Sequence, residues 1–217
     1  MTKSYFISFE GGEGCGKTTQ SKLLALSLLQ AGEEALLTRE PGGTKAAEAI
    51  RALLMNVETG ALDGRTDLLL HTAARNEHVV HAIKPALAKG VHVICDRFLD
   101  STLVYQGYGN QLGPEIVEKL HKLIIGDFYP DLTIILDIEA EQGLERAKER
   151  GNAVDRYEAM GLNFHKIICD NFRALVKNGQ NRYAMIDANQ DVSVIHKKII
   201  EIVRSRLDLT ELKECAL

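Results

Sequence analysis

A glycine-rich segment near the start of the chain has the residue types and spacing needed to bind phosphate groups. Gly11 and Gly16-Lys17-Thr18 fit the pattern Gly-x-x-x-x-Gly-Lys-[Ser/Thr]. Glycines let such a loop wrap so that successive backbone N–H groups point inward, and the helix predicted after it adds its positive N-terminal end. We expect Lys17 to contact the β- and γ-phosphates of a nucleotide and the Thr18 hydroxyl to bind Mg²⁺. The residues predicted to bind the nucleotide are Gly11, Gly12, Glu13, Gly14, Cys15, Gly16, Lys17, Thr18 and Thr19.

Cys15 lies inside this loop and allows two interpretations. A helix N-terminus can lower the pKa of a thiol, which would make Cys15 a reactive thiolate. A small residue that fills a tight loop is the simpler interpretation, and we favour it. The other cysteines are Cys95, Cys169 and Cys215. The spacing of the four fits neither a metal site nor a redox pair, so a reduced, cytoplasmic setting is expected.

Two arginines and an aspartate follow predicted strands, where ligands gather in an α/β sheet. Arg39 follows the strand predicted at 35–38, and Asp96 and Arg97 follow the strand predicted at 91–95. Two guanidinium groups can hold an acceptor phosphate in line for phosphoryl transfer. A surface salt bridge is the alternative for each arginine, and it is weaker for two arginines beside a phosphate loop. Asp96 is suited to bind Mg²⁺ or its water shell, with a helix cap as the alternative.

The pattern of hydrophobic residues predicts strands that alternate with helices. Such alternation indicates an α/β fold with a five-stranded parallel sheet and helices on both faces. The predicted strands are 5–9, 35–38, 91–95, 132–138 and 183–186. The predicted helices are 17–30, 44–55, 67–87, 115–125, 140–150, 162–177 and 192–206. The helix at 67–87 is expected to bend or break near Pro85, and 208–217 to be a weak helix or a frayed end.

Composition and charge limit the classes of function. The chain has 217 residues, of which 45% are hydrophobic and 26% charged, and this is ordinary for a single domain spanning 1–217. The net charge of -4, without long runs of like charge, makes a nucleic-acid partner unexpected. No stretch approaches the roughly 18 apolar residues of a membrane helix, and the N-terminal residues do not fit a signal peptide. We therefore expect no membrane association.

Several motifs, in order along almost the whole chain, resemble those of the thymidylate kinases, which phosphorylate dTMP with ATP. The glycine loop is shared by all P-loop proteins, whereas Arg-Glu-Pro-Gly-Gly-Thr and Asp-Arg-x-x-x-Ser followed by Tyr-Gln-Gly are much more specific. The resemblance implies the P-loop kinase fold with a small lid, transfer of the γ-phosphate of ATP to dTMP with Mg²⁺, and a homodimer, although the sequence by itself permits a monomer. The matching segments are 9–19, 38–44, 74–75, 96–101, 105–107, 126–132 and 155–158.

The resemblance also implies roles in the acceptor site. Glu13 is expected near the 3′-hydroxyl of the acceptor, and Arg75, Ser101, Thr102 and Gln106 around its base. Arg and Gln side chains can satisfy the carbonyl and N3–H groups of a pyrimidine. A pocket fitted to the 5-methyl group gains only about 1–3 kcal/mol over the unmethylated base, so dUMP is expected to be a poor substrate.

Three further positions leave details of the acceptor site open. Tyr105 is expected to pack near the sugar and crowd a 2′-hydroxyl, with a place in the core as the alternative. His71 stands where the family usually has Phe, four residues before Arg75 and on the same helical face. An imidazole can stack on a base but offers less apolar area, and a partly buried structural histidine is an equal alternative. Asn110 stands where relatives often carry Arg.

A cluster of basic residues marks the segment 146–158 as a candidate lid. The glycine loop contains no Arg, so the resemblance assigns the cation that stabilises the transition state to the lid. Arg150 is the first candidate, with Arg146 and Arg156 next, whereas Lys148 fits a solvated helix face better. The predicted catalytic set is Lys17, Asp96, Arg97, Arg146, Arg150 and Arg156.

Two other classes of function share the glycine loop. A different small-molecule kinase, such as a deoxynucleoside or adenylate kinase, is one, but a nucleoside kinase does not need two arginines for an acceptor phosphate. A nucleotide-dependent switch is the other, and it would bind ATP without acceptor-dependent release of ADP. The pair formed by Arg39 and Arg97 argues against a switch.

Overall fold

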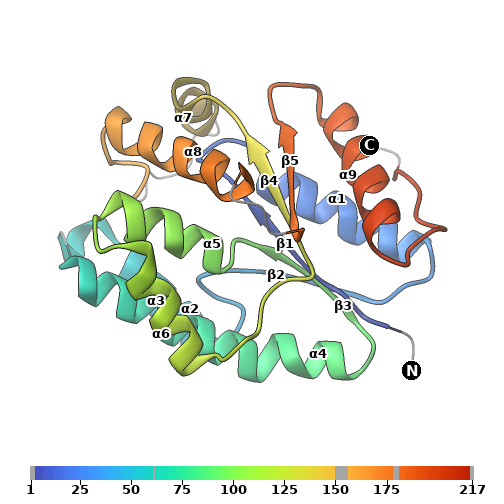
Figure 1. The fold of residues 1–217 in the computed structure, drawn as a ribbon, viewed down its shortest axis with the longest axis horizontal. Coiled ribbons are helices and arrows are strands. Elements are labelled where there is room, and N and C mark those ends of the chain that lie inside the picture. The colour runs from blue at the N-terminus through green and yellow to red at the C-terminus, as the bar shows by residue number, and fades with distance from the viewer. Residues whose placement is uncertain (1–2, 61, 150–155, 178–180, 216–217) are drawn as a thin grey trace.

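Short runs of β-branched and aromatic residues form the central sheet. The structure is a computed structural model that describes residues 3–60, 62–149, 156–177 and 181–215. Five strands pair in parallel in the order β2-β3-β1-β4-β5 (Figure 1). The parallel five-stranded sheet expected from the sequence is confirmed. The strands are β1 (Phe6–Glu10), β2 (Ala35–Arg39), β3 (His92–Asp96), β4 (Leu132–Asp137) and β5 (Tyr183–Asp187).

The helices that connect these strands agree with the predicted ones to within a few residues at most ends. They are α1 (Lys17–Gln30), α2 (Lys45–Met55), α3 (Gly64–His78), α4 (Lys84–Ala88), α5 (Leu99–Thr102), α6 (Pro114–Ile124), α7 (Ala140–Glu149), α8 (Leu162–Lys177) and α9 (Val192–Arg206). A short 3₁₀ turn, η1 (Val57–Thr59), follows α2, and two π-helical segments are η2 (Val79–Ile83) and η3 (Leu103–Gly109).

Two of these helical regions differ from the prediction. The helix expected at 67–87 begins at Gly64 and is interrupted by η2, just before Pro85, whose missing N–H cannot continue the regular hydrogen bonding. The segment α5–η3, from Leu99 to Gly109, was not predicted as a helix. It carries two glycines, Gly107 and Gly109, and four polar residues, Asp100, Ser101, Thr102 and Gln106, so its hydrophobic pattern is weak.

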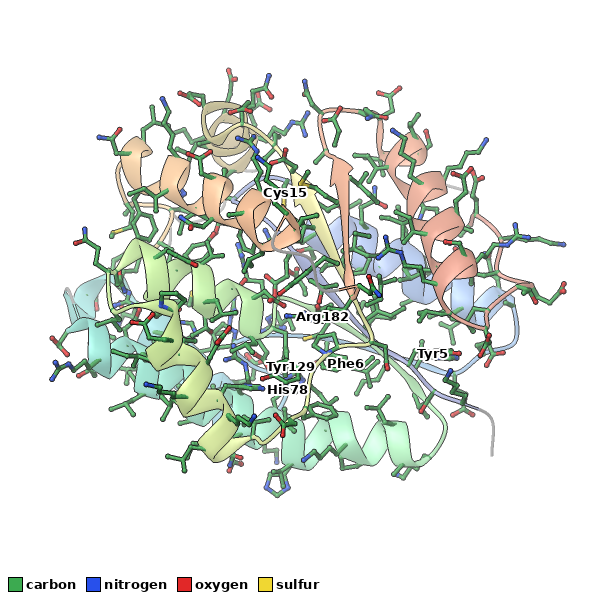
Figure 2. All side chains as sticks on the ribbon, viewed as in Figure 1. Tyr5, Phe6, Cys15, His78, Tyr129 and Arg182 are labelled. Atoms are coloured by element: carbon green, nitrogen blue, oxygen red, sulfur yellow. The ribbon has the colours of Figure 1, made fainter. Side chains whose placement is uncertain are left out.

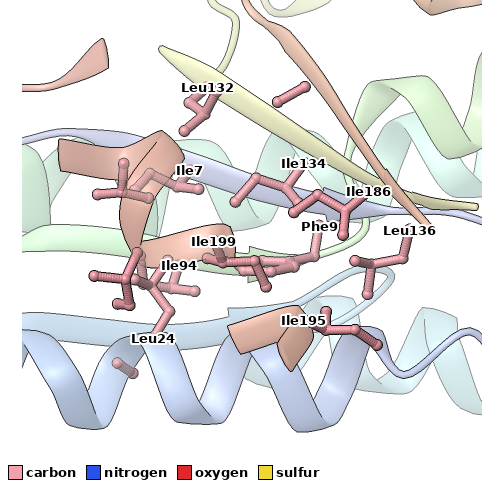
Figure 3. Close-up of a cluster of buried hydrophobic side chains, with 14 of the residues drawn as sticks. Ile7, Phe9, Leu24, Ile94, Leu132, Ile134, Leu136, Ile186, Ile195 and Ile199 are labelled. Carbon is pink, nitrogen blue, oxygen red and sulfur yellow. The ribbon is translucent and has the colours of Figure 1, made fainter. Parts of the chain in front are cut away.

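One face of the sheet is covered by α1 and α9, which lie side by side in Figure 1. Alternating strand residues such as Ile7, Phe9 and Ile134 point to this face and contact Leu24 of α1 and Ile199 of α9 (Figure 3). All five side chains are fully buried. This face is therefore mainly apolar, although it also buries the contact between Ser27 of α1 and His196 of α9.

The other face is covered by the helices from α3 to α6 and by α8. Phe6 and Val93 pack there against Phe98 and Val117, and Ile135 packs against Phe172 of α8. The same face also buries polar strand residues, among them Ser8 and Glu10 of β1 and Thr133 of β4. Helices on both faces confirm the predicted architecture, and this second face buries the carboxyl group of Glu10 at the carboxyl end of β1.

The C-terminal segment is neither a helix nor a frayed end within its described residues, so that prediction was wrong. Residues 208–215 form turns and extended chain, and Leu209, Leu212 and Cys215 are buried. The two leucines join the core cluster beneath α1 and α9, so the burial of apolar side chains orders this segment. Across the described residues, no helix is both long and apolar enough to span a membrane.

Candidate active site

A cavity of about 400 Å³ lies at the carboxyl ends of the central strands, where ligands gather in parallel sheets. It brings together most of the residues selected from the sequence. Those that line it are Glu13, Gly14, Gly16, Lys17, Thr18, Thr19, Arg39, His71, Arg75, Asp96, Arg97, Ser101, Thr102, Tyr105, Gln106 and Arg146. Of the other predicted residues, Gly11, Gly12, Cys15 and Arg156 are described but lie outside the lining, and Arg150 falls outside the described residues.

The glycine loop connects β1 to α1 and is tightly packed. Gly14 and Gly16 have left-handed φ angles of 68° and 93°, and a Cβ at Gly14 would clash with the backbone of α7. Lys17 Nζ donates to the carbonyl oxygen of Gly12 at 2.7 Å, so the ammonium group is held within its own loop. Cys15 is 2% exposed, and its sulfur would lie 2.8 Å from a Cβ at Gly11. This packing agrees with a small residue that fills a tight loop.

Figure 2 marks the two ends of β1: Tyr5 lies before its start, and Cys15 lies beyond its carboxyl end, on the side of the sheet where the loop is found.

Thr18 and Asp96 meet at the edge of this loop. Thr18 Oγ1 donates to Asp96 Oδ2 at 2.5 Å, joining the first turn of α1 to the end of β3. Mg²⁺ prefers oxygen ligands, keeps several waters and takes only one or two protein groups besides phosphate oxygens. A hydroxyl and a carboxylate in contact beside a phosphate loop therefore fit the magnesium site expected from the sequence.

Arg97 lines the cavity and makes several hydrogen bonds there. Its φ of 69° places it in the left-handed region, and its backbone N–H donates to Phe9 O at 2.9 Å. The guanidinium donates to Glu13 Oε1 at 2.6 Å and to Ser101 Oγ at 3.1 Å. Burial would raise the pKa of Glu13, but the nearby charges of Arg97 and Lys17 outweigh burial and hold that pKa at about 2.

Glu10 is a site residue that the sequence analysis did not single out. Its carboxyl group is fully buried, accepts the Phe98 N–H at 2.7 Å and lies 2.5 Å from Ser101 Oγ. Burial, helped by the negative charge of Asp100, raises the pKa of Glu10 to about 8. A carboxyl group at the end of a buried strand, directly before the glycine loop, is the signal that could have revealed it.

Arg39 and Arg75 differ in solvent exposure. Arg39 is half-exposed and forms an ion pair with Glu48 of α2, with 2.9 Å between Nη2 and Oε2. The salt bridge considered as an alternative for Arg39 is thus present, although the side chain also lines the cavity. Arg75 is 3% exposed, and it donates to Glu40 Oε2 at 2.7 Å and to Thr102 Oγ1 at 2.8 Å.

We call the part of the cavity that is lined by His71, Arg75, Tyr105 and Gln106 its far end. His71 Nε2 lies 2.7 Å from the Tyr157 hydroxyl, and burial lowers the pKa of His71 to about 4, so the imidazole is neutral. Tyr105 packs edge-on against Phe172 and its hydroxyl donates to Glu13 at 2.8 Å, so it belongs to the core and lines the cavity as well. Tyr157 also lines the cavity and was not predicted to do so.

The described part of the candidate lid separates two of its arginines. Arg146 lines the cavity, and its guanidinium donates to Ala188 O at 2.8 Å and to Asn189 Oδ1 at 3.0 Å. Arg156 instead forms an ion pair with Asp67, a buried residue of α3 that the sequence analysis missed. Residues 150–155 of the lid lie outside the described residues.

Comparison with known proteins shows the family of this chain. A sequence model described as thymidylate kinase matches residues 9–199. A thymidylate kinase of Geobacter sulfurreducens is 44% identical over 208 residues, covering 94% of this chain and 98% of that protein. One of Afipia carboxidovorans is 47% identical over 204 residues, covering 93% of this chain and 90% of that protein. A crystal structure of thymidylate kinase from Ehrlichia chaffeensis superposes with a TM-score of 0.74 at 37% identity, covering 93% of this chain and 98% of that one. This chain therefore belongs to the thymidylate kinase family.

Proposed function

We propose that this protein transfers the γ-phosphate of ATP to dTMP, giving ADP and dTDP, with Mg²⁺ on the phosphates. The observation that carries the proposal is a single cavity lined by the glycine loop and by four further side chains. Arg39 and Arg97 follow strands, and the buried Arg75 and Gln106 lie at its far end. A donor phosphate, an acceptor phosphate and a base each find suitable groups there. Family membership supports this assignment.

The donor side uses the glycine loop and the start of α1. Backbone N–H groups of the loop and the N-terminal end of α1 bind the ATP phosphates. Lys17 leaves its carbonyl partners in the loop to contact the β- and γ-phosphates. Thr18 and Asp96 would hold Mg²⁺, which would supply positive charge at the transferring phosphoryl group.

The acceptor side uses Arg97 and Arg39. Arg97 is fixed by Glu13 and Ser101, so its guanidinium is already oriented before the acceptor binds. Arg39 exchanges its ion pair with Glu48 for the acceptor phosphate, at little cost because that pair is half-exposed. Glu13, held by Arg97 and Tyr105, faces the deoxyribose 3′-hydroxyl, and Tyr105 limits space at the 2′ position. Ser101 and Thr102 complete the wall between sugar and base.

Among the described lid residues, Arg146 is the candidate for the cation that stabilises the transition state. It lines the cavity and donates hydrogen bonds to two uncharged groups, Ala188 O and Asn189 Oδ1, whereas Arg156 is paired with Asp67. Arg150, the first candidate from the sequence, lies outside the described residues, so its assignment rests on the sequence alone. Turnover numbers of Arg146→Met and Arg150→Ala, compared with Lys148→Met as the control, distinguish these assignments: the catalytic arginine lowers kcat, and the control does not.

The test of the proposed function is a coupled ADP-release assay with dTMP, dUMP, thymidine and AMP as acceptors. We expect rapid release of ADP with dTMP, slow release with dUMP and only background release with thymidine or AMP. Release with thymidine alone would indicate a nucleoside kinase, and release without any acceptor would indicate a nucleotide-dependent switch. Omission of Mg²⁺ is expected to abolish turnover with dTMP.

We further propose that the protein works as a homodimer in the cytoplasm. Apolar side chains are exposed on helices that contact one another on one side of the molecule, including Leu69 of α3 at 57% and Leu123 of α6 at 79%. Exposed apolar groups gathered on adjacent elements are typical of protein interfaces. All four cysteines are free, in agreement with a reducing compartment.

A further inference from the structure

Asp67, in the first turn of α3, is a buried carboxylate that accepts hydrogen bonds from several side chains. The residue is 1% exposed. Its Oδ2 accepts from Gln106 Nε2 at 2.8 Å and from Asn110 Nδ2 at 3.3 Å. Its Oδ1 accepts from the Tyr157 hydroxyl at 2.8 Å and pairs with Arg156. One buried carboxylate thus joins α3, η3 and the end of the candidate lid, at Arg156 and Tyr157.

These contacts determine which way the amide of Gln106 faces. An ionised carboxylate accepts hydrogen bonds and donates none, so only the NH₂ end of the amide can face Asp67. Nε2 of Gln106 also reaches the Tyr157 hydroxyl at 3.2 Å. Both N–H groups are therefore used on this side. The carbonyl oxygen, Oε1, accepts no hydrogen bond from the part of the chain that the structure describes, and Gln106 lines the cavity.

The neighbouring groups hold the same arrangement. The Tyr157 hydroxyl has one proton, which goes to Asp67, while the oxygen accepts from Gln106 and from Arg156 Nη2 at 2.8 Å. His71 Nε2 lies 2.7 Å from the same oxygen. Turning the Gln106 amide would set its carbonyl against a carboxylate and break this network.

The cavity therefore presents a hydrogen-bond acceptor from Gln106 beside the donor groups of Arg75. Arg75 uses Nε and Nη2 on Glu40, Phe98 and Thr102, and its Nη1 has no partner among the described residues. A base with an N3–H donor next to a 4-carbonyl acceptor matches this pair. Cytosine has the opposite polarity, because its N3 accepts and its 4-amino group donates.

We propose that Asp67 is a positioning residue that fixes the Gln106 amide and thereby makes the cavity select pyrimidines with an N3–H over cytosine. Asp67 acts only through Gln106 and Tyr157, and it is not one of the residues that line the cavity. The inference rests on the proposed function, since it concerns the base of the same acceptor.

The test replaces the acceptor-only group by one that can also donate. In Asp67→Asn, the new amide can donate to Gln106 Oε1, so both orientations of Gln106 become possible. We expect the KM for dTMP to rise about ten-fold with a smaller change in kcat. We also expect the ratio of kcat/KM for dCMP to that for dTMP to rise at least about ten-fold. Asp67→Glu keeps an acceptor-only group and is expected to keep the wild-type ratio.

Asn110→Ala is the matched control, because it removes one donor from Asp67 without changing what Asp67 can accept. Its dCMP/dTMP ratio is expected to equal that of wild type. In a Gln106→Leu background, Asp67→Asn is expected to leave the ratio unchanged, since no amide remains to be oriented. If Asp67→Asn does not fold, judged by its thermal unfolding, Asp67→Ser provides the same loss of an acceptor-only group with a smaller side chain.

A folded Asp67→Asn or Asp67→Ser protein with the wild-type dCMP/dTMP ratio would overturn the inference. So would a ratio that shifts equally in Asn110→Ala, because loss of general packing would then explain it. Wild-type protein that does not release ADP with dTMP would instead count against the proposed function, so the two failures are distinguishable.

Discussion

At the scale of single residues, the buried carboxyl group of Glu10 supports the strained backbone of Arg97. Glu10 accepts the Phe98 N–H at 2.7 Å and contacts Ser101 Oγ, which in turn accepts from Arg97. A non-glycine residue at positive φ is costly and persists only when its surroundings hold it. Glu10 is thus part of what holds the Arg97 guanidinium over the cavity.

The raised pKa of Glu10 makes stability depend on pH. Its pKa rises from 4.5 to about 8 on folding, so the folded protein keeps a proton that the unfolded chain loses. The stabilising contribution is fully present below pH 4.5 and is lost as the pH rises through about 8. Glu10→Gln mimics the protonated form. From about pH 6 to about pH 7.5, we expect wild type to lose roughly 2 kcal/mol of unfolding free energy relative to Glu10→Gln.

Urea unfolding of both proteins at several pH values checks this expectation. Glu141→Gln serves as the control, since Glu141 is exposed and its pKa is lowered by the hydrogen bond from Lys166. Parallel pH profiles for wild type and Glu10→Gln would contradict the prediction.

His71 provides a second prediction at this scale. Its neutral imidazole lines the cavity beside Tyr157. If the ring stacks on the base, His71→Ala should raise the KM for dTMP about three- to ten-fold, and His71→Phe should raise it less. The pKa of about 4 means that the charge of His71 does not change between about pH 6 and pH 8, so His71 adds no pH dependence to KM in that range. Steady-state kinetics decide the matter: a KM for His71→Ala equal to wild type would show that the histidine is only structural.

At the scale of secondary-structure elements, α3 is the helix that arranges the far end of the cavity. Asp67, His71 and Arg75 follow one another at intervals of four, so they lie along one face. Asp63 caps the start of the helix, and its side chain accepts from Arg65 N at 3.0 Å and from Thr66 N at 3.4 Å. It continues into the π-helical η2 instead of ending at His78.

The Asp63 cap is expected to contribute to the stability of α3. Asp63→Ala should lower the free energy of unfolding by about 0.5–2 kcal/mol, and Asp63→Asn should cost less because Asn also caps well. Asp191 offers a matched control, because it precedes α9 without a side-chain cap hydrogen bond. Chemical denaturation of Asp63→Ala and Asp191→Ala gives the comparison, and an equal loss in both would argue against the cap.

At the scale of the whole molecule, the two faces of the sheet differ in the side chains that they bury and in what these contribute. The face under α1 and α9 buries aliphatic side chains and provides stability. The opposite face buries a polar network that ends at the cavity, including the ion pair of Arg182 and Asp100 at 2.7 Å. The helices over this second face also carry the exposed apolar side chains proposed to form the dimer.

The proposed dimer can be tested by adding charge to that surface. Leu123→Glu combined with Leu69→Glu should raise the dimer dissociation constant at least about ten-fold, because each carboxylate would be desolvated in an apolar interface. Sedimentation velocity over a range of concentrations measures the change. Leu29→Glu is the control, since Leu29 is 55% exposed on α1, away from these helices. A monomer at all concentrations in wild type, or no difference between the variants, would remove the proposed interface.

The sequence by itself determined the order and type of most elements, the glycine loop and the family. These features depend on residues close together in the chain: hydrophobic periodicity, glycines before a helix, and arginines directly after strands. For the same reason the sequence indicated that Lys17, Thr18, Arg39, Asp96 and Arg97 would meet at one edge of the sheet, and all five line the cavity.

Only the tertiary structure decided how those side chains are held. Asp67 meets Arg156 and Tyr157 across about ninety positions of sequence, and Glu10 meets Ser101 across 91. No local pattern encodes such pairs, because they form when separate elements pack together. Burial then set the protonation of Glu10 and His71, since a pKa depends on the solvent and charges that the fold leaves around the group. The residues for the chemistry can thus be found in the sequence, whereas their orientation, as with Gln106 on Asp67, is a property of the packed fold.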